Sequence, residues 1–298
     1  MTDLLGVMES WGAMSTRVRA EDGTLTEIAL SDIVSGKPVP PRPSPRMRVS
    51  AEQACRLSNA SWPAIATRPL GEWLLRASGG FSARANSVMA TGDPGLGFDD
   101  ALAQVRGFYA GHGLPAWAQV VVGSATAARF ADAGWGPARP GEADSQFALA
   151  PVAQASRAVR RRLPPDAPAV EVAGRVTPRW LAGDERAREH LDAALAVLQG
   201  PDEVGFAEVP AGAGELAARG RVAGTGDWAG ITDVWVSPRR RRQGLALVVL
   251  SALLDWAAER GATSAYLQVR GDNEAGLALY GSVGFRTHHT YRYLAAPA

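Results

Sequence analysis

Four consecutive arginines, Arg239–Arg242, stand immediately before the start of an expected helix and are the residues best suited to binding chemistry. The segment that follows, Leu245–Arg260, carries leucines and valines at helical spacing. The first amide groups of a helix have no internal partners and lie at the positive end of the helix dipole, so they favour anions. Gly244 and Ala246 leave room for a ligand beside the backbone. Guanidinium groups at such a helix start suit a diphosphate better than a single carboxylate.

The segments around this turn are expected to alternate between strand and helix. Ile231–Val236 is rich in strand formers, and Pro238 cannot continue a strand ladder. After the long helix and a stop at Gly261, we expect a strand over Ala265–Arg270 and then a short helix that contains Tyr280. The predicted order is therefore strand, arginine turn, helix, strand, helix.

The run Arg241-x-x-Gly244-x-Ala246 after a Val-Trp-Val strand resembles the acyl-CoA signature of the GNAT N-acetyltransferases. The elements that follow, including Asn273 and the final Gly284-Phe285, come in the order of the second half of a GNAT domain. The resemblance implies a mixed-sheet α/β fold and an N-acetyltransferase that uses acetyl-CoA as co-substrate and needs no metal. Transfer to the amine would then be direct, within a ternary complex.

The same resemblance assigns roles to particular residues. Tyr280 would protonate the departing CoA thiolate, and Asp233 is the first candidate for the base that deprotonates the amine, with Glu208 as the second. The residues assigned to acetyl-CoA binding are Val234, Trp235, Val236, Arg241, Arg242, Gln243, Gly244, Leu245, Ala246 and Asn273.

Several of these residues also have simpler structural explanations. An arginine run is commonly a solvated face, Asn273 is a favoured helix N-cap, and Tyr280 shares a helical face with Leu277 as a core tyrosine would. Trp180 fits the core better than the acceptor site. His288 and His289 are expected to be surface residues of a terminal strand.

An internal repeat indicates two GNAT-like units in tandem. The segment Ala128–Trp135 parallels Ala278–Phe285 and, like it, follows a glutamine-containing strand. The copies differ at the sites of chemistry, because Phe130 stands in the Tyr280 position. Asp99 and Asp100 follow the first copy's glycine-rich turn, where carboxylates would repel a diphosphate. The sequence therefore predicts a degenerate first copy and a catalytic second copy.

The predicted division of the chain follows from composition and pattern. We expect a short all-β module over 1–36, similar to the SH3-like barrel of some tandem GNAT proteins, and a proline-rich linker over 37–48. The degenerate unit would span 49–150, a second linker with a short helix 151–168, and the catalytic domain 169–298. In the β module, strands at Thr16–Ala20 and Thr24–Leu30 would be joined by an Asp-Gly hairpin turn.

Local patterns predict the remaining elements. The expected helices are Ala51–Ala60, Asp99–Ala110, Ala125–Ala133 and one that starts at Thr177-Pro178, breaks at Gly183 and continues to about Gln199. The expected strands are Glu72–Ala77, Ala85–Ala90, Ala116–Val122, Gln146–Ala150, Ala169–Val176, Val204–Val209 and Leu216–Ala223.

Composition excludes several classes of protein. In 298 residues, 31 basic side chains balance 30 acidic ones, so nothing favours nucleic-acid binding. The single cysteine, Cys55, rules out an internal disulfide and a thiolate zinc site, and it is expected to be a small buried residue. No apolar run is long enough to cross a bilayer and no signal peptide is visible, so the protein is expected to be cytoplasmic without a membrane partner.

The acceptor is left open by the sequence. The expected partner is an amine-bearing small molecule or peptide. An aminothiol sugar, as in the mycothiol-synthase kind of tandem GNAT, is one alternative, and a protein N-terminus or lysine is another. A non-catalytic acyl-CoA sensor or scaffold is the alternative of a different class, and an intact Tyr280 and arginine turn in the second copy argue against it.

Overall fold

The computed structural model describes residues 4, 6–20, 23–36, 45–182, 184–212 and 214–297. The chain divides into two compact units, Met1–Pro43 and Ser44–Ala298, and each is described by itself. Three sequence predictions fall partly outside the described residues: the proline-rich linker at 37–44, Asp22 of the hairpin turn, and the helix break at Gly183.

The N-terminal unit is an antiparallel three-stranded sheet in the order β1-β2-β3. Its strands are β1 (Gly6–Trp11), β2 (Ser15–Ala20) and β3 (Leu25–Ala29), followed by a 3₁₀ turn at Leu30–Asp32. The predicted hairpin of β2 and β3 is confirmed, with Thr16 opposite Ile28. The sequence missed β1, whose six residues are all exposed.

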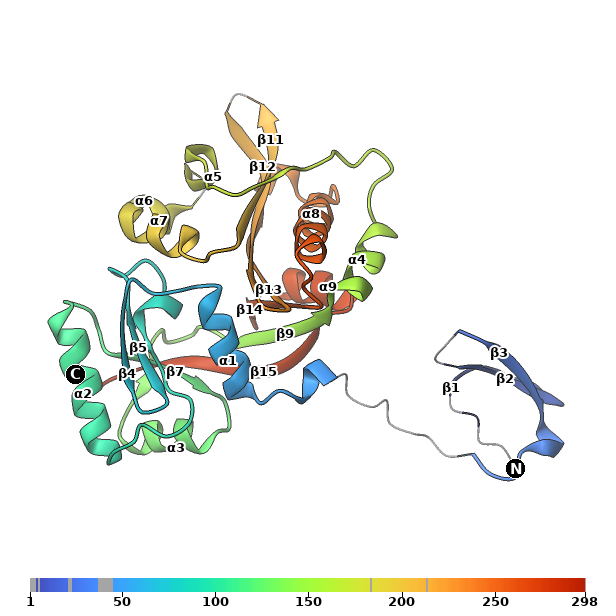
Figure 1. Cartoon of the computed structure of the whole chain (residues 1–298), viewed down its shortest axis with the longest axis horizontal. Helices are drawn as coiled ribbons and strands as arrows, with labels where there is room; N and C mark the ends of the chain where they lie inside the picture. The colour runs from blue at the N-terminus through green and yellow to red at the C-terminus, as the bar shows by residue number, and fades with distance from the viewer. Residues whose placement is uncertain are drawn as a thin grey trace. The chain divides into compact units, whose positions relative to one another are not determined.

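The larger unit is a mixed α/β structure built on one 12-stranded sheet (Figure 1). Its strands are β4 (Ala66–Leu70), β5 (Trp73–Ala77), β6 (Val88–Met89), β7 (Trp117–Val121), β8 (Gly136–Pro137), β9 (Ser145–Pro151), β10 (Val172–Ala173), β11 (Val204–Gly212), β12 (Glu215–Thr225), β13 (Trp228–Val236), β14 (Ser264–Arg270) and β15 (Arg286–Ala295). Its α-helices are α1 (Ala51–Ala60), α2 (Phe98–Gly111), α3 (Ala125–Asp132), α4 (Val152–Arg160), α5 (Pro178–Ala182), α6 (Glu185–Glu189), α7 (Leu191–Gln199), α8 (Leu245–Glu259) and α9 (Glu274–Ser282). Short 3₁₀ turns lie at Pro45–Arg48, Arg84–Asn86 and Pro238–Arg240.

The order of elements repeats along the larger unit. We call β4-β5-β6-α2-β7-α3-β9 the first copy and β11-β12-β13-α8-β14-α9-β15 the second copy. In each copy the third and fourth strands are parallel neighbours: β6 pairs with β7, and β13 pairs with β14. The duplicated segments found in the sequence are α3 and α9 with the residues that follow them.

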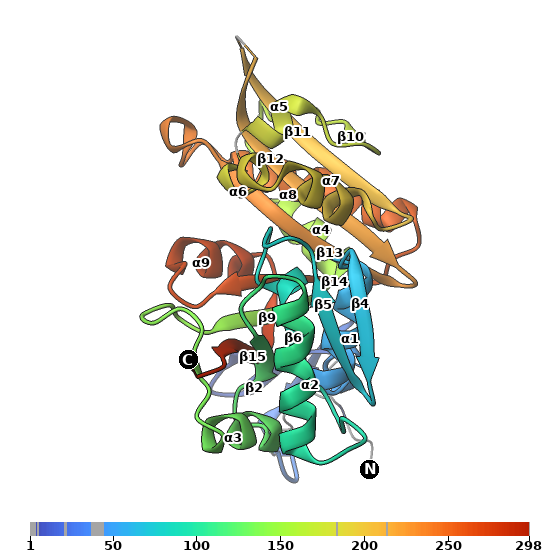
Figure 2. The same ribbon diagram turned by 90° about the vertical axis from the view of Figure 1, so that its left-hand side faces the viewer.

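The two copies are joined through their last strands, which pair across the repeat. In the sheet order, β14 is followed by β9, β15 and β7, so β9 pairs with β14 of the second copy and β15 pairs with β7 of the first. The early part of β15 also pairs with β9, from Arg286 opposite Leu149 to Tyr291 opposite Ser145. β9 and β15 lie between the two copies in Figure 2. The sheet is therefore continuous from one copy to the other.

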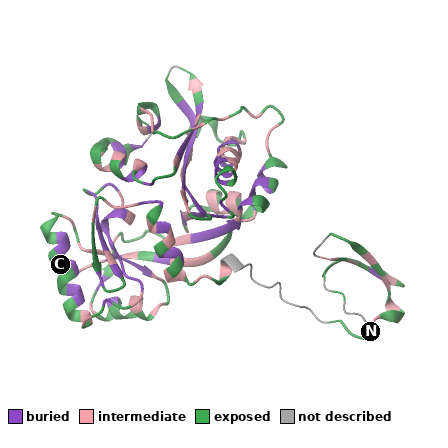
Figure 3. Cartoon of the chain, in the orientation of Figure 1, coloured by how far each residue is buried: buried purple, intermediate pink, exposed green. Residues whose placement is uncertain are grey.

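Helices cover both faces of the second copy's strands (Figure 1). On one face α8 and α4 bury an aliphatic cluster that includes Val249, Leu253 and Val159. On the other face α5 to α7 pack Trp180 and Val197 against β11 and β12. Buried positions follow the strands and the inner faces of these helices (Figure 3). The first copy has its own aromatic core beneath α2 and α3.

Most predicted elements are confirmed with small shifts of their ends, including α1, α2, α3, α8 and β14. Two strand predictions were wrong in extent. Over Ala169–Val176 only Val172 and Ala173 form a strand, and over Ala85–Ala90 the chain makes the 3₁₀ turn before the two residues of β6. The sequence missed β4, which contains Pro69 and lies at the edge of the sheet, where a missing amide is tolerated. Among the described residues, no helix is long and apolar enough to cross a membrane.

Candidate functional site

The strands β13 and β14 pair along only part of their length. Their parallel register runs from Trp228 opposite Ser264 to Ile231 opposite Leu267. Beyond that point β13 continues to Val236 and β14 to Arg270, and the described structure contains no pairing between these ends. On its other side β13 stays paired with β12 up to Val236. One edge of Thr232–Val236 is therefore open to an extended ligand that adds as a strand.

A β-bulge lies on β13 where the two strands separate. Arg219 on β12 pairs with Trp235 and Arg221 pairs with Thr232, so a single residue between the arginines faces both Asp233 and Val234. Asp233 has a φ of 52°, a left-handed conformation that is uncommon for residues other than glycine. Such backbone strain persists only when the surroundings hold it, and it is concentrated at functional sites.

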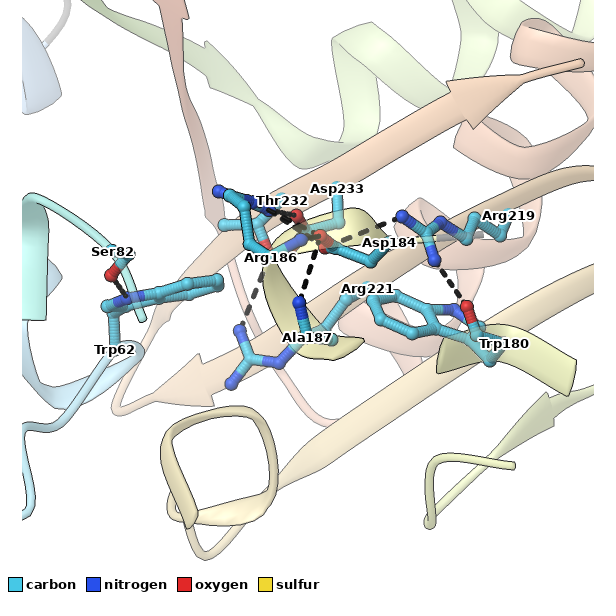
Figure 4. Close-up of polar contacts among 10 residues, drawn as sticks. All are labelled: Trp62, Ser82, Trp180, Asp184, Arg186, Ala187, Arg219, Arg221, Thr232 and Asp233. Atoms are coloured by element: carbon cyan, nitrogen blue, oxygen red, sulfur yellow. Dashed lines mark hydrogen bonds and ion pairs between the residues drawn. The ribbon is translucent and has the colours of Figure 1, made fainter. Parts of the chain in front are cut away.

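An ion-pair network holds Asp233 (Figure 4). Arg186 Nη2 lies 3.1 Å from Asp233 Oδ1 and 2.9 Å from Asp184 Oδ2, and Arg219 Nη2 lies 3.5 Å from the same Asp184 oxygen. Burial favours the neutral acid, but the hydrogen bond and charge of Arg186 hold the pKa of Asp184 below its ordinary value. Asp184 therefore stays ionised, and Arg186, which pairs with both carboxylates, fixes one oxygen of Asp233.

The second oxygen of Asp233 is buried and has no hydrogen-bond partner in the described residues, and the side chain as a whole is 10% exposed. An unpaired carboxylate oxygen at such depth costs free energy, so its presence calls for an explanation. Asp233 lines a cavity of about 740 Å³ whose walls come from both copies. This oxygen is suited to receive an ammonium group or a proton from a ligand in that cavity.

The arginine turn joins β13 to α8 as predicted. Arg239, Arg240, Arg241 and Arg242 are exposed, and the described part of the chain places no carboxylate in an ion pair with any of them. The first turn of α8 contains no acidic residue. The described backbone hydrogen bonds include none donated by the amide groups of residues 243–246. Charge and free donors therefore coincide at this helix start, as an anion site requires.

Gly244 is needed for a different reason than the sequence suggested. Its φ is 75°, and a Cβ atom added there would lie 2.6 Å from Pro164 Cγ. The space beside Gly244 is filled by the segment that follows α4, so the expectation that this glycine opens room for a ligand on that side was wrong. The residue instead lets the turn close against Pro164.

Tyr280 lies on α9 against the core of the second copy, edge-to-face with Phe285 at 6.1 Å between ring centres. No described residue forms a hydrogen bond with its hydroxyl. Burial, and then the negative charge of Asp233, raise the pKa of Tyr280 to about 12, so its proton is retained at neutral pH.

Two cavities lie on opposite faces of β14. Leu267 and Val269 line a cavity of about 410 Å³ together with Tyr280, whereas Gln268 and Arg270 line the larger cavity that contains Asp233. Alternate residues of a strand point to opposite faces, so this division follows from the strand itself. Thr232 and Asp233 place the separated end of β13 in the wall of the larger cavity, whereas the smaller cavity is lined from β9, β14, α9 and the start of β15.

Asn273 caps α9, because its side-chain oxygen accepts a hydrogen bond of 3.0 Å from the amide of Gly276. The capping explanation is confirmed, and contact with a ligand stays a prediction. Trp180 is fully buried in the core. Glu208 accepts a hydrogen bond from Thr177 and pairs with Arg179, so its charge is already engaged.

The expectation that His288 and His289 are surface residues was wrong, since both are half-buried. His289 stacks on Phe147 at 4.8 Å between ring centres, and its Nε2 lies 3.5 Å from Sγ of Cys55. Burial, and then its neighbour His288, lower the pKa of His289 to about 4. Cys55 is a buried free thiol, as expected.

Among the residues of the larger cavity that sequence reasoning missed are Arg84, Arg186 and Gln268. Arg84 comes from a 3₁₀ turn of the first copy and Gln268 from β14 of the second. No local pattern marks either residue, because they meet only through the pairing of the copies. The glutamine-containing strand was noted as part of the repeat, without a role for Gln268.

Among the described residues, no group of His, Cys, Asp and Glu side chains is arranged to hold a metal ion.

Comparison with known proteins agrees with this fold. A tandem GNAT protein from the clavulanic acid biosynthesis pathway superposes with a TM-score of 0.55 at 16% identity, over 71% of this chain and 76% of that one. The uncharacterized N-acetyltransferase YobR of Bacillus subtilis is 27% identical over 80% of this chain and 96% of its own length. The probable histone acetyltransferase Rv0428c of Mycobacterium tuberculosis is 28% identical over 95% of this chain and 85% of its own.

The fold and these relatives define the class: the chain is a GNAT-type N-acetyltransferase. Residues 50–294 match the family model described as the C-terminal region of the probable histone acetyltransferase Rv0428c, and the chain belongs to that family.

Proposed function

We propose that the second copy transfers an acetyl group from acetyl-CoA directly to an amine, within a ternary complex. The observation that carries the proposal is the open edge of β13, which leads from the bulge at Asp233 to the arginine turn. An extended pantetheine arm pairs with such an edge, and a diphosphate binds at the helix start where the edge ends.

Each part of the site has a place in this reaction. Acetyl-CoA supplies the acetyl group as an activated thioester. The backbone of Val234, Trp235 and Val236 pairs with the amides of the pantetheine arm. Gln243, Gly244, Leu245 and Ala246 offer their amides to the pyrophosphate, with Arg241 and Arg242 beside it. Asn273 contacts the arm from the start of α9.

The proton balance assigns the two catalytic roles. Asp233 orients the acceptor ammonium with its free oxygen and takes up the proton that the nitrogen must lose to attack. The C–N bond forms, the C–S bond breaks, and Tyr280 gives its proton to the departing sulfur. The nitrogen, which is positively charged after attack, releases its second proton to water, and Tyr280 is reprotonated from solvent. A tyrosine whose pKa is raised to about 12 keeps that proton until negative charge develops beside it.

The test is an acceptor screen with acetyl-CoA that follows release of the CoA thiol. Polyamines, amino sugars, aminothiols, amino acids and lysine peptides form the panel, and calorimetry measures acetyl-CoA binding separately. We expect saturable binding and thiol release with at least one amine. Binding without transfer to any amine would favour an acyl-CoA sensor instead, and absence of binding would contradict the proposal.

A protein lysine is the second candidate acceptor. It is favoured by the relative from Mycobacterium tuberculosis, which is named a probable histone acetyltransferase. The lysine peptides in the panel test it directly.

A further inference from the structure

The cavity beside Asp233 carries unpaired polar groups from both copies of the fold. It is lined by Arg84 of the first copy and by Asp233 and Gln268 of the second. Each contributes one buried polar atom without a hydrogen-bond partner in the described residues: Arg84 Nε, Asp233 Oδ2 and Gln268 Nε2. The two nitrogen atoms are hydrogen-bond donors and the oxygen is an acceptor. A matching ligand therefore carries acceptor atoms for Arg84 and Gln268 and a donor for Asp233.

Arg84 is a cation without a counter-ion inside this cavity. Its guanidinium lies 5.0 Å over the ring of Trp62, and the structure describes no carboxylate in an ion pair with it. The other arginines of the cavity wall are each compensated: Arg139 by Glu142, Arg186 by Asp184 and Asp233, Arg270 by Glu142 and Asp272, and Arg292 by Asp144. A charge left unpaired in a partly buried site favours an anionic ligand.

Gln268 provides a second donor. Its Oε1 accepts a 2.6 Å hydrogen bond from the hydroxyl of Tyr291, which fixes the side chain and leaves Nε2 free. Tyr291 comes from β15, the strand that crosses to the first copy. The pairing of the copies therefore brings the two donors, Arg84 and Gln268, to one cavity.

Asp233 and Arg84 line the same cavity without forming an ion pair in the described structure. Burial opposes the charge of Arg84, while neighbouring tyrosines and Asp233 raise its pKa, so the guanidinium stays charged. The two side chains form no ion pair with each other, and Asp233 uses its other oxygen for Arg186. A ligand that bridges them needs a positive group at one end and a negative group at the other.

We propose that the acceptor is a small amine that also carries a carboxylate, which in chemical terms is a free amino acid. Its amino group lies at Asp233, and its carboxylate is bound by Arg84 and Gln268. This inference rests on the proposed function, since it names the acceptor of the same transfer. The first copy then contributes to the reaction as the half that recognises the substrate carboxylate. A protein lysine or a polyamine brings no carboxylate and leaves Arg84 unpaired.

The experiment compares acceptors that differ in the carboxylate alone. Free amino acids are paired with their carboxamides, with a blocked lysine amide as the protein-like probe. Thiol release gives kcat/KM, and calorimetry in the presence of CoA measures binding of the same compounds. We expect each accepted amino acid to exceed its amide by at least about tenfold in kcat/KM, mainly through KM, because charged hydrogen bonds contribute this much.

Three variants test whether Arg84 causes the preference for amino acids over their carboxamides. Arg84→Gln should abolish the preference and Arg84→Lys should keep part of it, while the affinity for acetyl-CoA stays unchanged in both. Arg129→Gln is the matched control, because Arg129 also lies over an aromatic ring, Phe98, outside the cavity. It should behave as the wild type. Dividing the preference of each variant by that of the wild type removes the difference in amine basicity between acids and amides.

The outcomes separate the two proposals. Equal rates for acids and amides in the wild type, or an undiminished preference in Arg84→Gln, would overturn the carboxylate assignment and leave the transferase proposal standing. Preferred acetylation of the blocked lysine amide would also overturn the carboxylate assignment alone. The absence of both binding and turnover for every amino acid would have the same consequence. Failure to bind acetyl-CoA would instead remove the proposed function itself.

Discussion

The starts of α8 and α2 occupy equivalent places in the two copies and have opposite charge. Arginines without carboxylate partners in the described structure precede α8, and its first turn is free of acids. The first turn of α2 contains Asp99 and Asp100. In the loop before α2, Glu72 Oε2 accepts a 2.8 Å hydrogen bond from the amide of Asp93, and Asp93 Oδ1 accepts one from Gly95. In the first copy, carboxylates of the same copy therefore accept hydrogen bonds from the backbone amides of this loop.

This difference shows how one fold supports two roles. A helix start attracts an anion only while its amides are free and the local charge is positive. The second copy meets both conditions, whereas the first copy carries negative charge at its helix start. A similar contrast appears at Phe130, which is fully buried among aromatic rings where Tyr280 keeps a hydroxyl. We infer that the first copy has kept its packing and supplies one wall of the acceptor cavity.

The largest expected effect on activity comes from giving residue 280 of the second copy the side chain that the first copy has at Phe130. Tyr280→Phe keeps the ring and removes the proposed acid, so kcat should fall by about 10² or more while acetyl-CoA still binds. Thermal stability should change little, because the hydroxyl has no partner in the described structure. Steady-state kinetics with the best acceptor from the screen, and a melting curve, measure both.

Tyr109→Phe in the first copy is the matched control. The Tyr109 hydroxyl donates to Arg76 O at 3.1 Å and accepts from Arg76 N at 3.3 Å, both buried. Its removal should lower stability by about 1–3 kcal/mol and leave kcat near wild type. If Tyr280→Phe instead loses stability and keeps kcat within about threefold, Tyr280 is a packing residue.

A smaller effect is expected from reversing the charge of the second copy's turn. Arg241→Glu with Arg242→Glu should weaken acetyl-CoA binding by about tenfold to a hundredfold, since charge-assisted hydrogen bonds are lost. The fold should be unaffected because both side chains are exposed. Arg106→Glu with Arg129→Glu applies the same charge change to the first copy and should leave calorimetric affinity unaltered. Equal affinity in both double variants would mean that the arginine run is a solvated face.

The smallest effect concerns the first copy's turn and depends on pH. The hydrogen bond from the Asp93 amide, and then the charge of Arg56, hold the pKa of Glu72 below its ordinary 4.5. Glu72 therefore stabilises the fold above its unfolded pKa, and this contribution is lost as pH falls through the lower folded value. Glu72→Gln should melt below wild type at neutral pH, with the difference narrowing below pH 4.5. A pH-independent difference in Tm would contradict this assignment.

Local chemistry made much of the second copy predictable. Pro238, the arginines and Gly244 mark a turn in any context, and the apolar spacing of α8 and the Asn273 cap require no knowledge of neighbours. The repeat was visible because α3 and α9 keep similar residues at the same spacing.

Features that depend on distant contacts were not predictable. The pairing of β15 with β7 and β9 is set by both copies together, and the sequence of β15 contains no pattern that identifies its partner strands. The bulge at Asp233 arises from the register against β12. Arg84 and Gln268 are remote in sequence and share a cavity only after the copies pair. These are the parts of the site on which the proposed acceptor assignment rests.

The central claim is that the second copy alone binds acetyl-CoA, and the most direct measurement is the binding stoichiometry of the full chain. Isothermal titration calorimetry with acetyl-CoA should give about one site per chain, because one of the two helix starts combines free amides with positive charge. The Arg241→Glu, Arg242→Glu double variant should weaken that same site. A stoichiometry near two, with one site unaffected by the double variant, would show that the first copy also binds acetyl-CoA and would contradict the account.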